Sequence, residues 1–273
     1  MNKEIPVKFN SGNKKIPIER PELIYGATAI VSNDNNDKTA INPYTNETIP
    51  VINLGENEIR FFIPAHNQED FEIAKLKNLP IKQVIAPYFT GSQNDKIKKN
   101  VKLETRHSVI AVIKHPKKDC FLCVKTKQRM CQSFVMGGIE NNETPEETAI
   151  REVQEETGYQ NVNIQYTSAF KIVNHFYAEN KGVNRLSFLN IVFGQLNDLS
   201  SKPISKEENE KHDVLWVAKD ELKNFLNLNI NQFALNILKN GDRAILTDGI
   251  MLTDDEYNLI PSEKVRNILL KSL

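Results

Sequence analysis

The amino-acid sequence predicts a mixed fold, α+β or α/β in class, that is divided into three consecutive regions. Runs rich in β-branched and aromatic residues, separated by turn residues, predict short strands through most of the chain. Capping residues predict one well-defined helix at residues 145–157. A polar, turn-rich stretch at residues 90–100 predicts a boundary near residue 100. We therefore expect regions at 1–100, 101–240 and 241–273.

The first region is expected to contain short strands, turns and one helix. The helix covers residues 67–78 and ends before Pro80, because proline disfavours helical backbone in the residue that precedes it. The strand candidates are the segments LIYGATAIV at 23–31, TIPVINL at 48–54 and IRFFIPAH at 59–66.

The second and third regions continue with strands and helices. A hairpin is expected at residues 108–125, because the segment alternates and is rich in β-branched residues. Residues 219–239 are expected to be helical with a break near the asparagines. Further strands are expected at 163–173, 185–196 and 212–218, and the last region is expected to form a short strand at 244–252 and a closing helix at 262–273.

The composition is typical of a soluble globular protein, with 40% hydrophobic and 26% charged residues. Lys plus Arg and Asp plus Glu both number 35, so no global field directs the chain toward nucleic acid or a membrane, and only local basic patches remain open. No apolar run has the length of a signal-peptide core at the start of the chain or of a membrane span elsewhere. We therefore expect a cytoplasmic protein without a membrane partner.

The chain has three cysteines, and an odd number in a sequence of this length argues against a disulfide framework. Cys120 and Cys123 form a C-x-x-C motif, which is compatible with a metal or redox site. On a strand, however, a spacing of three places the two thiols on opposite faces. No second C-x-x-C and no paired histidine follows, so packing is the favoured interpretation.

The residues around the segment ETPEETAIREVQEETGY (143–159) specify a helix locally. Thr144 suits the N-cap, Pro145 the first helical position and Glu147 a capping box. Gly158 is placed for the C-terminal cap. These four residues predict where the helix begins and where it ends.

Three glutamates of this helix, Glu152, Glu155 and Glu156, are spaced so that they project from one side. A charge run is usually a solvated face with Glu–Lys pairs four residues apart, but residues 148–158 contain no lysine. Carboxylates that converge repel one another, and a hard divalent cation relieves that repulsion. Arg151 could orient one carboxylate or neutralise part of the cluster. The pattern therefore favours a metal site over a solvated face.

The spacing extends beyond the helix. From Gly137 to Tyr159 the sequence reads G-x5-E-x7-R-E-V-x-E-E-x-G-Y, with Glu143 and Arg151 at fixed positions. This stretch fills every signature position of the Nudix box and therefore resembles the Nudix hydrolases. One departure is that residues 135–137 are Val-Met-Gly where many members have Pro-Gly-Gly, which affects any metal contact expected from the main chain there.

The resemblance implies an α/β/α sandwich with a mixed sheet, in which the box forms a loop, a helix and a loop. It implies Mg²⁺ or Mn²⁺ held by Glu152, Glu155 and Glu156, and hydrolysis of a nucleoside diphosphate linked to another moiety. Such a metal neutralises charge on the pyrophosphate and lowers the pKa of a bound water. Glu152 is either the general base or a ligand only. The resemblance implies a catalytic set of Arg151, Glu152, Glu155 and Glu156, and structural box residues Gly137, Glu143 and Gly158.

Residues that would bind the rest of the substrate are marked less specifically. Tyr177 lies near the position where dinucleoside-polyphosphate hydrolases of the family carry a base-stacking tyrosine, and an ordinary strand-edge residue is the alternative. Lys127 and Arg129 are candidates for phosphate binding, although basic hairpin ends are common. Glu210, like its acidic neighbours at 207 and 208, is a candidate ligand or base, and an ordinary acidic loop explains it equally.

The flanks resemble the editing domain of bacterial-type leucyl-tRNA synthetase. The similar segments are residues 19–31, 63–87 and 246–273, and they occur in the order found in the synthetase. The resemblance implies a small β-barrel-like domain that is built from both chain ends and split by a Nudix insertion. Because the editing domain hydrolyses mischarged aminoacyl-tRNA, the resemblance makes tRNA a candidate partner.

The editing-like pocket is only partly retained. Arg20, His66 and Asp70 match the family, as do Pro21 and Glu22. Apart from the resemblance, Asp70 is expected to interact with the dipole of its helix. The family's threonines, its Gly-Thr-Gly segment and one Asp are replaced by Ile18, Glu19, Leu23, residues 56–58 and Asn67.

These observations support three hypotheses. The preferred one is a metal-dependent Nudix hydrolase of a nucleotide-type pyrophosphate, inserted in a degenerate editing scaffold. The second is a module that deacylates aminoacyl-tRNA in trans or binds RNA. The third is a binding module that has lost both activities. The complete glutamate set favours the first hypothesis over the third, and the replaced threonines favour it over the second.

Overall fold

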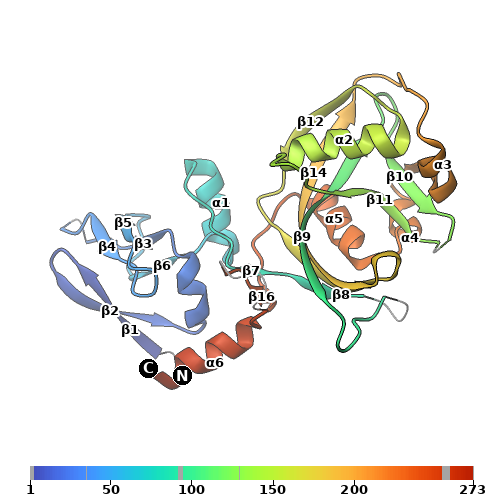
Figure 1. The fold of residues 1–273 in the computed structure, drawn as a ribbon. Coiled ribbons are helices and arrows are strands. Elements are labelled where there is room, and N and C mark those ends of the chain that lie inside the picture. Colours follow the sequence, from blue (N-terminus) through green and yellow to red (C-terminus); the bar gives the residue numbers. More distant parts are fainter. Residues whose placement is uncertain (1–2, 35, 92–94, 129, 254–258, 273) are drawn as a thin grey trace. The chain divides into compact units, whose positions relative to one another are not determined.

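The computed structural model describes residues 3–34, 36–91, 95–128, 130–253 and 259–272. The chain divides into two compact units, the first comprising Met1–Pro87 with Arg243–Leu273 and the second Tyr88–Asp242 (Figure 1). The first unit is therefore built from both ends of the chain. The division precedes the boundary expected near residue 100, because β8 (Tyr88–Thr90) pairs in parallel with β13 (Ile172–Ala178) of the second unit.

A six-stranded sheet forms most of the first unit. Its strands are β1 (Lys3–Phe9), β2 (Gly12–Ile18), β3 (Ala29–Val31), β4 (Thr39–Ile41), β5 (Thr48–Ile52) and β6 (Arg60–Phe62), in the order β2-β1-β4-β5-β3-β6. The edge strands β2 and β6 approach each other, so the sheet curls into a barrel-like form. Val7, Ile16 and Ile30 are fully buried in its apolar core.

Segments from both chain ends complete this unit. β7 (Ile85–Ala86) pairs antiparallel with β16 (Ile250–Met251). The C-terminal helix α6 (Ser262–Ser272) packs on the 3-10 helix η1 (Pro21–Gly26), where Arg266 is hydrogen-bonded to the buried Glu22 at 2.8 Å. Segments that precede and follow the second unit in the sequence therefore pack together in one unit, as the resemblance to a single split domain implies.

Two helix predictions for the first unit are confirmed and two strand predictions need correction. α1 (Gln68–Lys77) and α6 occupy the segments expected to be helical. The strand expected at 23–31 is wrong in its first half, because Pro21 begins a 3-10 helix with its φ already near the helical value. The strand expected at 244–252 is limited to β16, two residues that pair with β7.

The second unit is built on an eight-stranded mixed sheet. Besides β8 and β13 its strands are β9 (Leu103–Lys114), β10 (Cys120–Thr126), β11 (Gln132–Gly138), β12 (Val162–Thr167), β14 (Val183–Leu196) and β15 (His212–Ala218). The order is β15-β10-β11-β9-β14-β13-β8, and β12 pairs with the end of β14. The β9–β14 and β8–β13 pairs are parallel.

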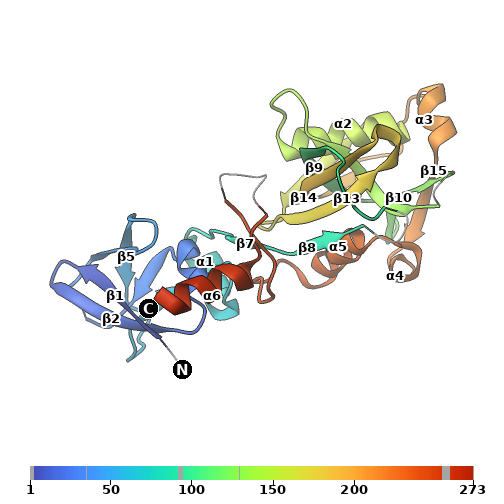
Figure 2. The same ribbon diagram turned by 60° about the horizontal axis from the view of Figure 1, so that its bottom comes forward.

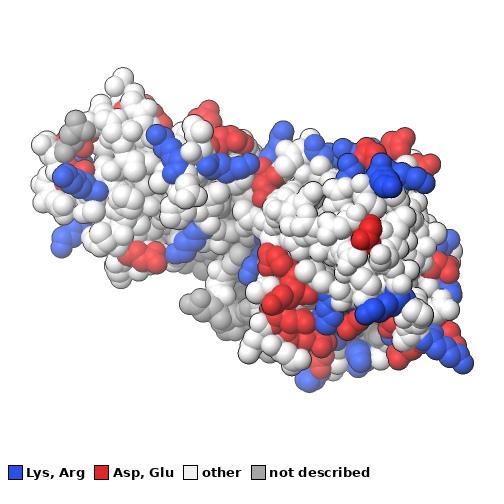
Figure 3. All heavy atoms as spheres, turned by 90° about the horizontal axis from the view of Figure 1, so that it is seen from above, with Lys and Arg blue, Asp and Glu red and all other residues white. Residues whose placement is uncertain are grey.

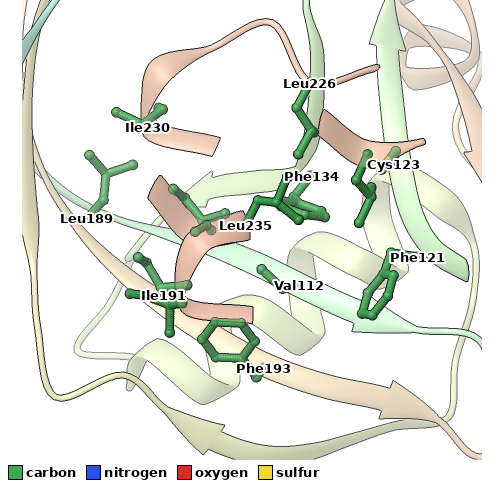
Figure 4. Packing of buried hydrophobic residues seen from close by; sticks show 14 of the residues in the cluster. Val112, Phe121, Cys123, Phe134, Leu189, Ile191, Phe193, Leu226, Ile230 and Leu235 are labelled. Carbon is green, nitrogen blue, oxygen red and sulfur yellow. The ribbon is translucent and has the colours of Figure 1, made fainter. Parts of the chain in front are cut away.

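Helices cover both faces of this sheet, which gives the expected α/β/α sandwich (Figures 1 and 2). On one face, α2 (Pro145–Thr157) packs against β9 and β14. On the other face, α4 (Leu222–Phe225) and α5 (Asn229–Asn240) cover the core in which Phe134 and Leu235 meet (Figure 4). No helix in the described part of the chain is long and apolar enough to cross a membrane.

Strand positions in the second unit are predicted well, whereas strand neighbours are not. The hairpin expected at 108–125 is confirmed only next to its turn: β9 and β10 pair at Lys114 and Phe121, and β11 lies between them over the rest of their length. The strand expected at 163–173 is two strands, β12 and β13. Both strands pair with β14, and the residues between Thr167 and Ile172 leave that pairing. The helix break expected near the asparagines is confirmed between α4 and α5.

The cysteines are free thiols that serve packing. Cys123 is fully buried in the core beneath α5, whereas its neighbour Leu122 belongs to the core beneath α2. Successive residues of β10 therefore face opposite sides of the sheet. Burial raises the pKa of Cys123 to about 12, which keeps the thiol protonated. The packing interpretation of the C-x-x-C motif is therefore the one that the structure favours.

Candidate active site

The segment with the glutamates forms α2, and its ends are fixed by the residues predicted to cap it. The Thr144 hydroxyl accepts a hydrogen bond from the Glu147 amide at 3.2 Å, and the Glu147 carboxylate accepts one from the Thr144 amide at 2.8 Å. Gly158 ends the helix with a φ of 80°, a left-handed conformation that glycine adopts without strain. The helix prediction at 145–157 is confirmed at both ends.

Arg151 connects the helix to the loop before it. Its guanidinium donates to both carboxylate oxygens of Glu143, at 2.8 and 3.0 Å, and to the Gly138 carbonyl at 2.8 Å. Arg151 lowers the pKa of Glu143 to about 2, so this ion pair persists across the physiological range. Arg151 also donates to Glu152 at 2.8 Å and to Glu155 at 3.0 Å. It therefore orients two of the three predicted metal ligands.

Gly137 provides the space in which Glu152 lies. A Cβ atom at position 137 would be 1.7 Å from the Glu152 carboxyl carbon, so only glycine is compatible with this arrangement. The Glu152 side chain is buried, and burial raises its pKa against the opposing influence of Arg151. The structure thus explains why the sequence pattern requires glycine at this place.

Glu156 has the most perturbed carboxyl group of the site. Its Oε2 atom is buried and has no hydrogen-bond partner among the described residues. Burial raises the pKa of Glu156 to about 8, and the nearby carboxylates of Glu152 and Glu208 contribute in the same direction. An acidic group in this state has a strong tendency to hold a proton or to gain a cation.

These side chains line a pocket of about 390 Å³. Acidic side chains also gather on part of the second unit in the view of Figure 3. The charged residues that line the pocket are Arg106, Glu152, Glu155, Glu156, Glu208 and Lys211.

Within the described residues, no three His, Cys, Asp or Glu side chains already converge at metal-binding geometry. The reason is visible for Glu152 and Glu155, which are hydrogen-bonded to Arg151. The donor chemistry nevertheless fits a hard cation, because Glu156 offers a partnerless oxygen in a pocket shared with Glu152. Glu155 is exposed, and Arg151 contacts only its Oε2 atom, which leaves Oε1 for a cation.

The expected substrate-binding residues are not all brought to this pocket. Tyr177 lies on β13, outside the pocket lining, and the Lys98 ammonium lies 3.7 Å from the centre of its ring. Glu210 is exposed on α3 (Lys206–Lys211), 3.8 Å from Lys206, whereas its neighbour Glu208 lines the pocket. Lys127 donates to the Asn209 carbonyl, and Arg129 lies outside the described residues.

Arg106 lines the pocket but was not identified from the sequence. It lies on β9, where Ser108 and Ile110 follow it at every second position, so a charged residue in a strand rich in β-branched residues was the available signal. Burial, followed by the charge of Arg185, lowers the pKa of the Arg106 guanidinium. Lys211 and His212 were also missed, and both line the pocket.

The editing-like residues of the first unit serve its fold. His66 is buried, its Nδ1 lies 2.8 Å from the Ile245 carbonyl, and its Nε2 accepts from the amides of Val84 and Ile85. Arg20 donates to Glu22, to the Leu246 carbonyl and to Asp248.

Asp70 has a different role from the expected helix-dipole interaction. Its carboxylate accepts a hydrogen bond from the Ile63 amide at 2.7 Å and from Arg60 at 2.8 Å. Asn67 is the residue that caps α1, since its side-chain oxygen accepts from the Asp70 amide. Burial raises the pKa of Asp70 although both hydrogen-bond donors act in the opposite direction. Arg20, His66 and Asp70 are therefore each engaged by other residues of the first unit.

The fold and the site together define a mixed α/β/α sandwich whose acidic pocket is built by a loop–helix–loop segment. The family model described as NUDIX domain matches residues 104–240, half of the chain, and the chain belongs to this family. A second family model, described as leucyl-tRNA synthetase, editing domain, matches residues 32–117.

Short parts of the chain are similar to aminoacyl-tRNA ligases. The leucine–tRNA ligase of Fervidobacterium nodosum is 49% identical over 55 residues, which are 18% of this chain and 7% of the ligase. The valine–tRNA ligase of Nostoc sp. is 32% identical over 94 residues, 29% of this chain and 9% of the ligase. The chain thus spans less than a tenth of the length of these relatives.

Among solved structures, a NUDIX hydrolase from Nitrosomonas europaea is 21% identical with a TM-score of 0.39, and the match covers 52% of this chain and 94% of that one. An Ap4A hydrolase from C. elegans is 16% identical with a TM-score of 0.38, and the match covers 50% of this chain and 97% of that one.

Proposed function

We propose that the second unit is a metal-dependent Nudix pyrophosphohydrolase that cleaves a nucleoside diphosphate linked to another moiety. The observation that carries this proposal is the partnerless, buried carboxylate oxygen of Glu156 in a pocket shared with Glu152. A buried carboxylate oxygen without a partner, as in Glu156, costs stability in the absence of a cation, whereas Glu152 is hydrogen-bonded to Arg151. Membership of the NUDIX family supports the same reaction class.

Glu152, Glu155 and Glu156 would hold Mg²⁺ or Mn²⁺, the first two through the oxygens that Arg151 does not contact. When bound, such an ion neutralises charge on the pyrophosphate and lowers the pKa of a coordinated water. Glu156 loses its proton on binding, because a ligand carboxylate must be ionised. Arg151 would then keep its hydrogen bonds to Glu143 and thereby hold the loop before α2 in place.

Glu152 is our candidate for the group that accepts the proton of the attacking water. Arg151 binds one of its oxygens, Oε1, which leaves Oε2 for a second partner. Burial raises its pKa toward the range in which a carboxylate is an effective base near neutral pH. A role as metal ligand only is the alternative, and the Mg²⁺ dependence of kcat in Glu152→Gln separates the two: the loss of a pure ligand is rescued in part by high metal concentration, whereas the loss of a base is not.

The test is a pyrophosphohydrolase assay over a panel of nucleotides with Mg²⁺. We expect Glu156→Gln and Glu155→Gln to lower kcat, Glu156→Gln by a factor on the order of 10² or more, because the loss of one group that stabilises charge in a transition state has this magnitude. Glu210→Gln is the matched control, since Glu210 is an exposed glutamate that does not line the pocket. Wild-type protein without turnover of any substrate, or variants at full rate, would disprove the proposal.

A second candidate function follows from the match to the editing domain at residues 32–117. We propose that the first unit binds tRNA or acts as a scaffold, and that deacylation in trans is the alternative. The contacts of Arg20, His66 and Asp70 within the unit speak against a preserved editing pocket. Deacylation of mischarged leucine tRNA by wild type, and its loss in Asp70→Asn, would instead support the alternative.

A further inference from the structure

Arg106 is a cation of the pocket that the fold leaves without a counter-ion. Its side chain is half-buried, and within the described residues it has neither a hydrogen-bond nor an ion-pair partner. By contrast, Arg60, Arg151 and Arg266 each contact a carboxylate at 2.8 Å. Removing an unpaired guanidinium from water is costly, so a role in stabilising the fold does not explain Arg106.

Gly138 is the residue that makes room for this guanidinium. A Cβ atom at position 138 would be 1.7 Å from Nη2 of Arg106, just as one at position 137 would be 1.7 Å from the Glu152 carboxyl carbon. The two glycines are adjacent on β11, and adjacent residues of a strand face opposite sides of the sheet. Glu152 and Arg106 therefore lie on opposite sides of the end of β11, and both line the same pocket.

The surroundings of Arg106 make it more available to a ligand. Arg185 is its neighbour on β14 and adds positive charge, while the contact of Arg185 with Glu104 is 3.7 Å long. The buried Nε atom of Arg185 has no hydrogen-bond partner among the described residues. Glu152 and Glu140 attract Arg106 through space, but neither lies within ion-pair distance of it in the described part of the chain. Arg106 therefore lines the pocket with unused donors, and Arg185, which lies outside the pocket lining, adds positive charge near it.

We propose that Arg106 binds a phosphoryl group of the substrate directly, beside the carboxylates that would bind the metal. This inference rests on the proposed hydrolase function and deepens it. A guanidinium presents planar donors that match two oxygens of a phosphate, which an ammonium group does not. The pocket then has an acidic part that needs a cation and a basic part that needs an anion. It is suited to a ligand with two linked phosphoryl groups rather than one.

Calorimetric titration of the protein with inorganic pyrophosphate in the presence of Mg²⁺ tests this role. We expect Arg106→Gln to weaken binding about tenfold or more, as expected for the loss of a charge-assisted hydrogen bond. Arg106→Lys should recover part of the loss, because it restores the charge but not the planar pair of donors. Lys102→Gln is the matched control, since Lys102 is an exposed cation at the start of the same strand region and its partner is Glu104. It should bind within about twofold of wild type.

Gly138→Ala provides a second route to the same result, because its methyl group would displace the guanidinium without removing it. The fluorescence of Trp216, the single tryptophan of the chain, verifies that the second unit of each variant is folded. Folded Arg106→Gln that binds pyrophosphate as tightly as wild type would overturn the inference, as would wild type without measurable pyrophosphate affinity. Nucleotide turnover by wild type together with unchanged affinity in Arg106→Gln would remove this inference alone and leave the proposed hydrolase function intact.

Discussion

The two units treat buried charge in opposite ways. In the first unit, Asp70 is paired with Arg60 and His66 is hydrogen-bonded through both ring nitrogens. In the second unit, the buried Oε2 atom of Glu156 and the half-buried guanidinium of Arg106 have no partner among the described residues. Since unpaired buried charge is costly, it persists where a ligand supplies the missing partner. The comparison supports the proposal that the acidic pocket binds a ligand, whereas Asp70 and His66 are held by contacts within the first unit.

The largest expected effect is in the first unit, where Asp70→Ala should lower the free energy of unfolding by about 3 kcal/mol. This value is at the low end for a broken buried ion pair, because Arg60 is partly exposed. The replacement leaves both Arg60 and the Ile63 amide without their acceptor. Hydrogen exchange of peptides from β3 and β6 measures the loss. Glu69→Ala, an exposed neighbour on α1, should change it by less than about 0.5 kcal/mol.

In the second unit, Glu156→Gln should stabilise the fold when no metal is present, in contrast to the destabilising Asp70→Ala. A carboxyl group whose pKa is raised to about 8 favours folding below the unfolded value near 4.5, and this contribution is lost as the pH rises through 8. Without metal at pH 9, Glu156→Gln should therefore raise the Tm of the second unit, by roughly 5 °C. Thermal unfolding followed by Trp216 fluorescence provides the measurement. A lower Tm of the variant at pH 9 would show that the carboxylate is satisfied in the native protein.

Mg²⁺ should make wild type more stable than Glu156→Gln, which is the reverse of the order expected without metal. A cation that binds the native state stabilises it in proportion to the logarithm of its concentration above the dissociation constant. We expect about 2.7 kcal/mol for wild type at a hundredfold excess over the dissociation constant. Glu156→Gln should gain far less. The same fluorescence melt at increasing Mg²⁺ concentration tests this, and Glu210→Gln should respond as wild type does.

A smaller effect is expected from acid in the first unit. Burial lowers the pKa of His66 to about 4, so the folded state holds fewer protons than the unfolded state between pH 4 and the ordinary histidine value of 6.5. The contribution to stability is complete above 6.5 and is lost as the pH falls through 4. His66→Gln should be less stable at pH 7 yet less sensitive to acid. If wild type and His66→Gln lose stability equally as the pH falls, His66 is not the group responsible for the acid sensitivity.

The smallest effect should come from Glu210→Gln, which removes an exposed contact with Lys206 at 3.8 Å. Exposed ion pairs of this kind contribute little, so we expect a change in unfolding free energy below about 0.5 kcal/mol. Its neighbour Glu208→Gln should behave differently, because Glu208 lines the pocket and raises the pKa of Glu156. Titration of Glu156 by NMR should show a lower pKa in Glu208→Gln only.

The predictions that succeeded rest on local interactions. α2 begins and ends where Thr144, Pro145 and Gly158 predict, since a cap acts within one turn of the chain. β15 and the break between α4 and α5 also lie where their sequences place them. The predictions that failed concern partners far apart in sequence. β11 separates β9 from β10, and no pattern within the expected hairpin at 108–125 encodes that insertion.

The sequence by itself determined the Nudix box, the helix that bears its glutamates and the identity of the residues that match an editing domain. It did so because spacing along a helix fixes which side chains share a face. Only the tertiary structure decided how each of those residues is used. In the folded chain Asp70 is paired with Arg60, the Oε2 atom of Glu156 has no partner among the described residues, and the Arg106 guanidinium lies against Gly138. Desolvation and charge pairing depend on segments brought together by folding, and therefore no local pattern could assign these roles.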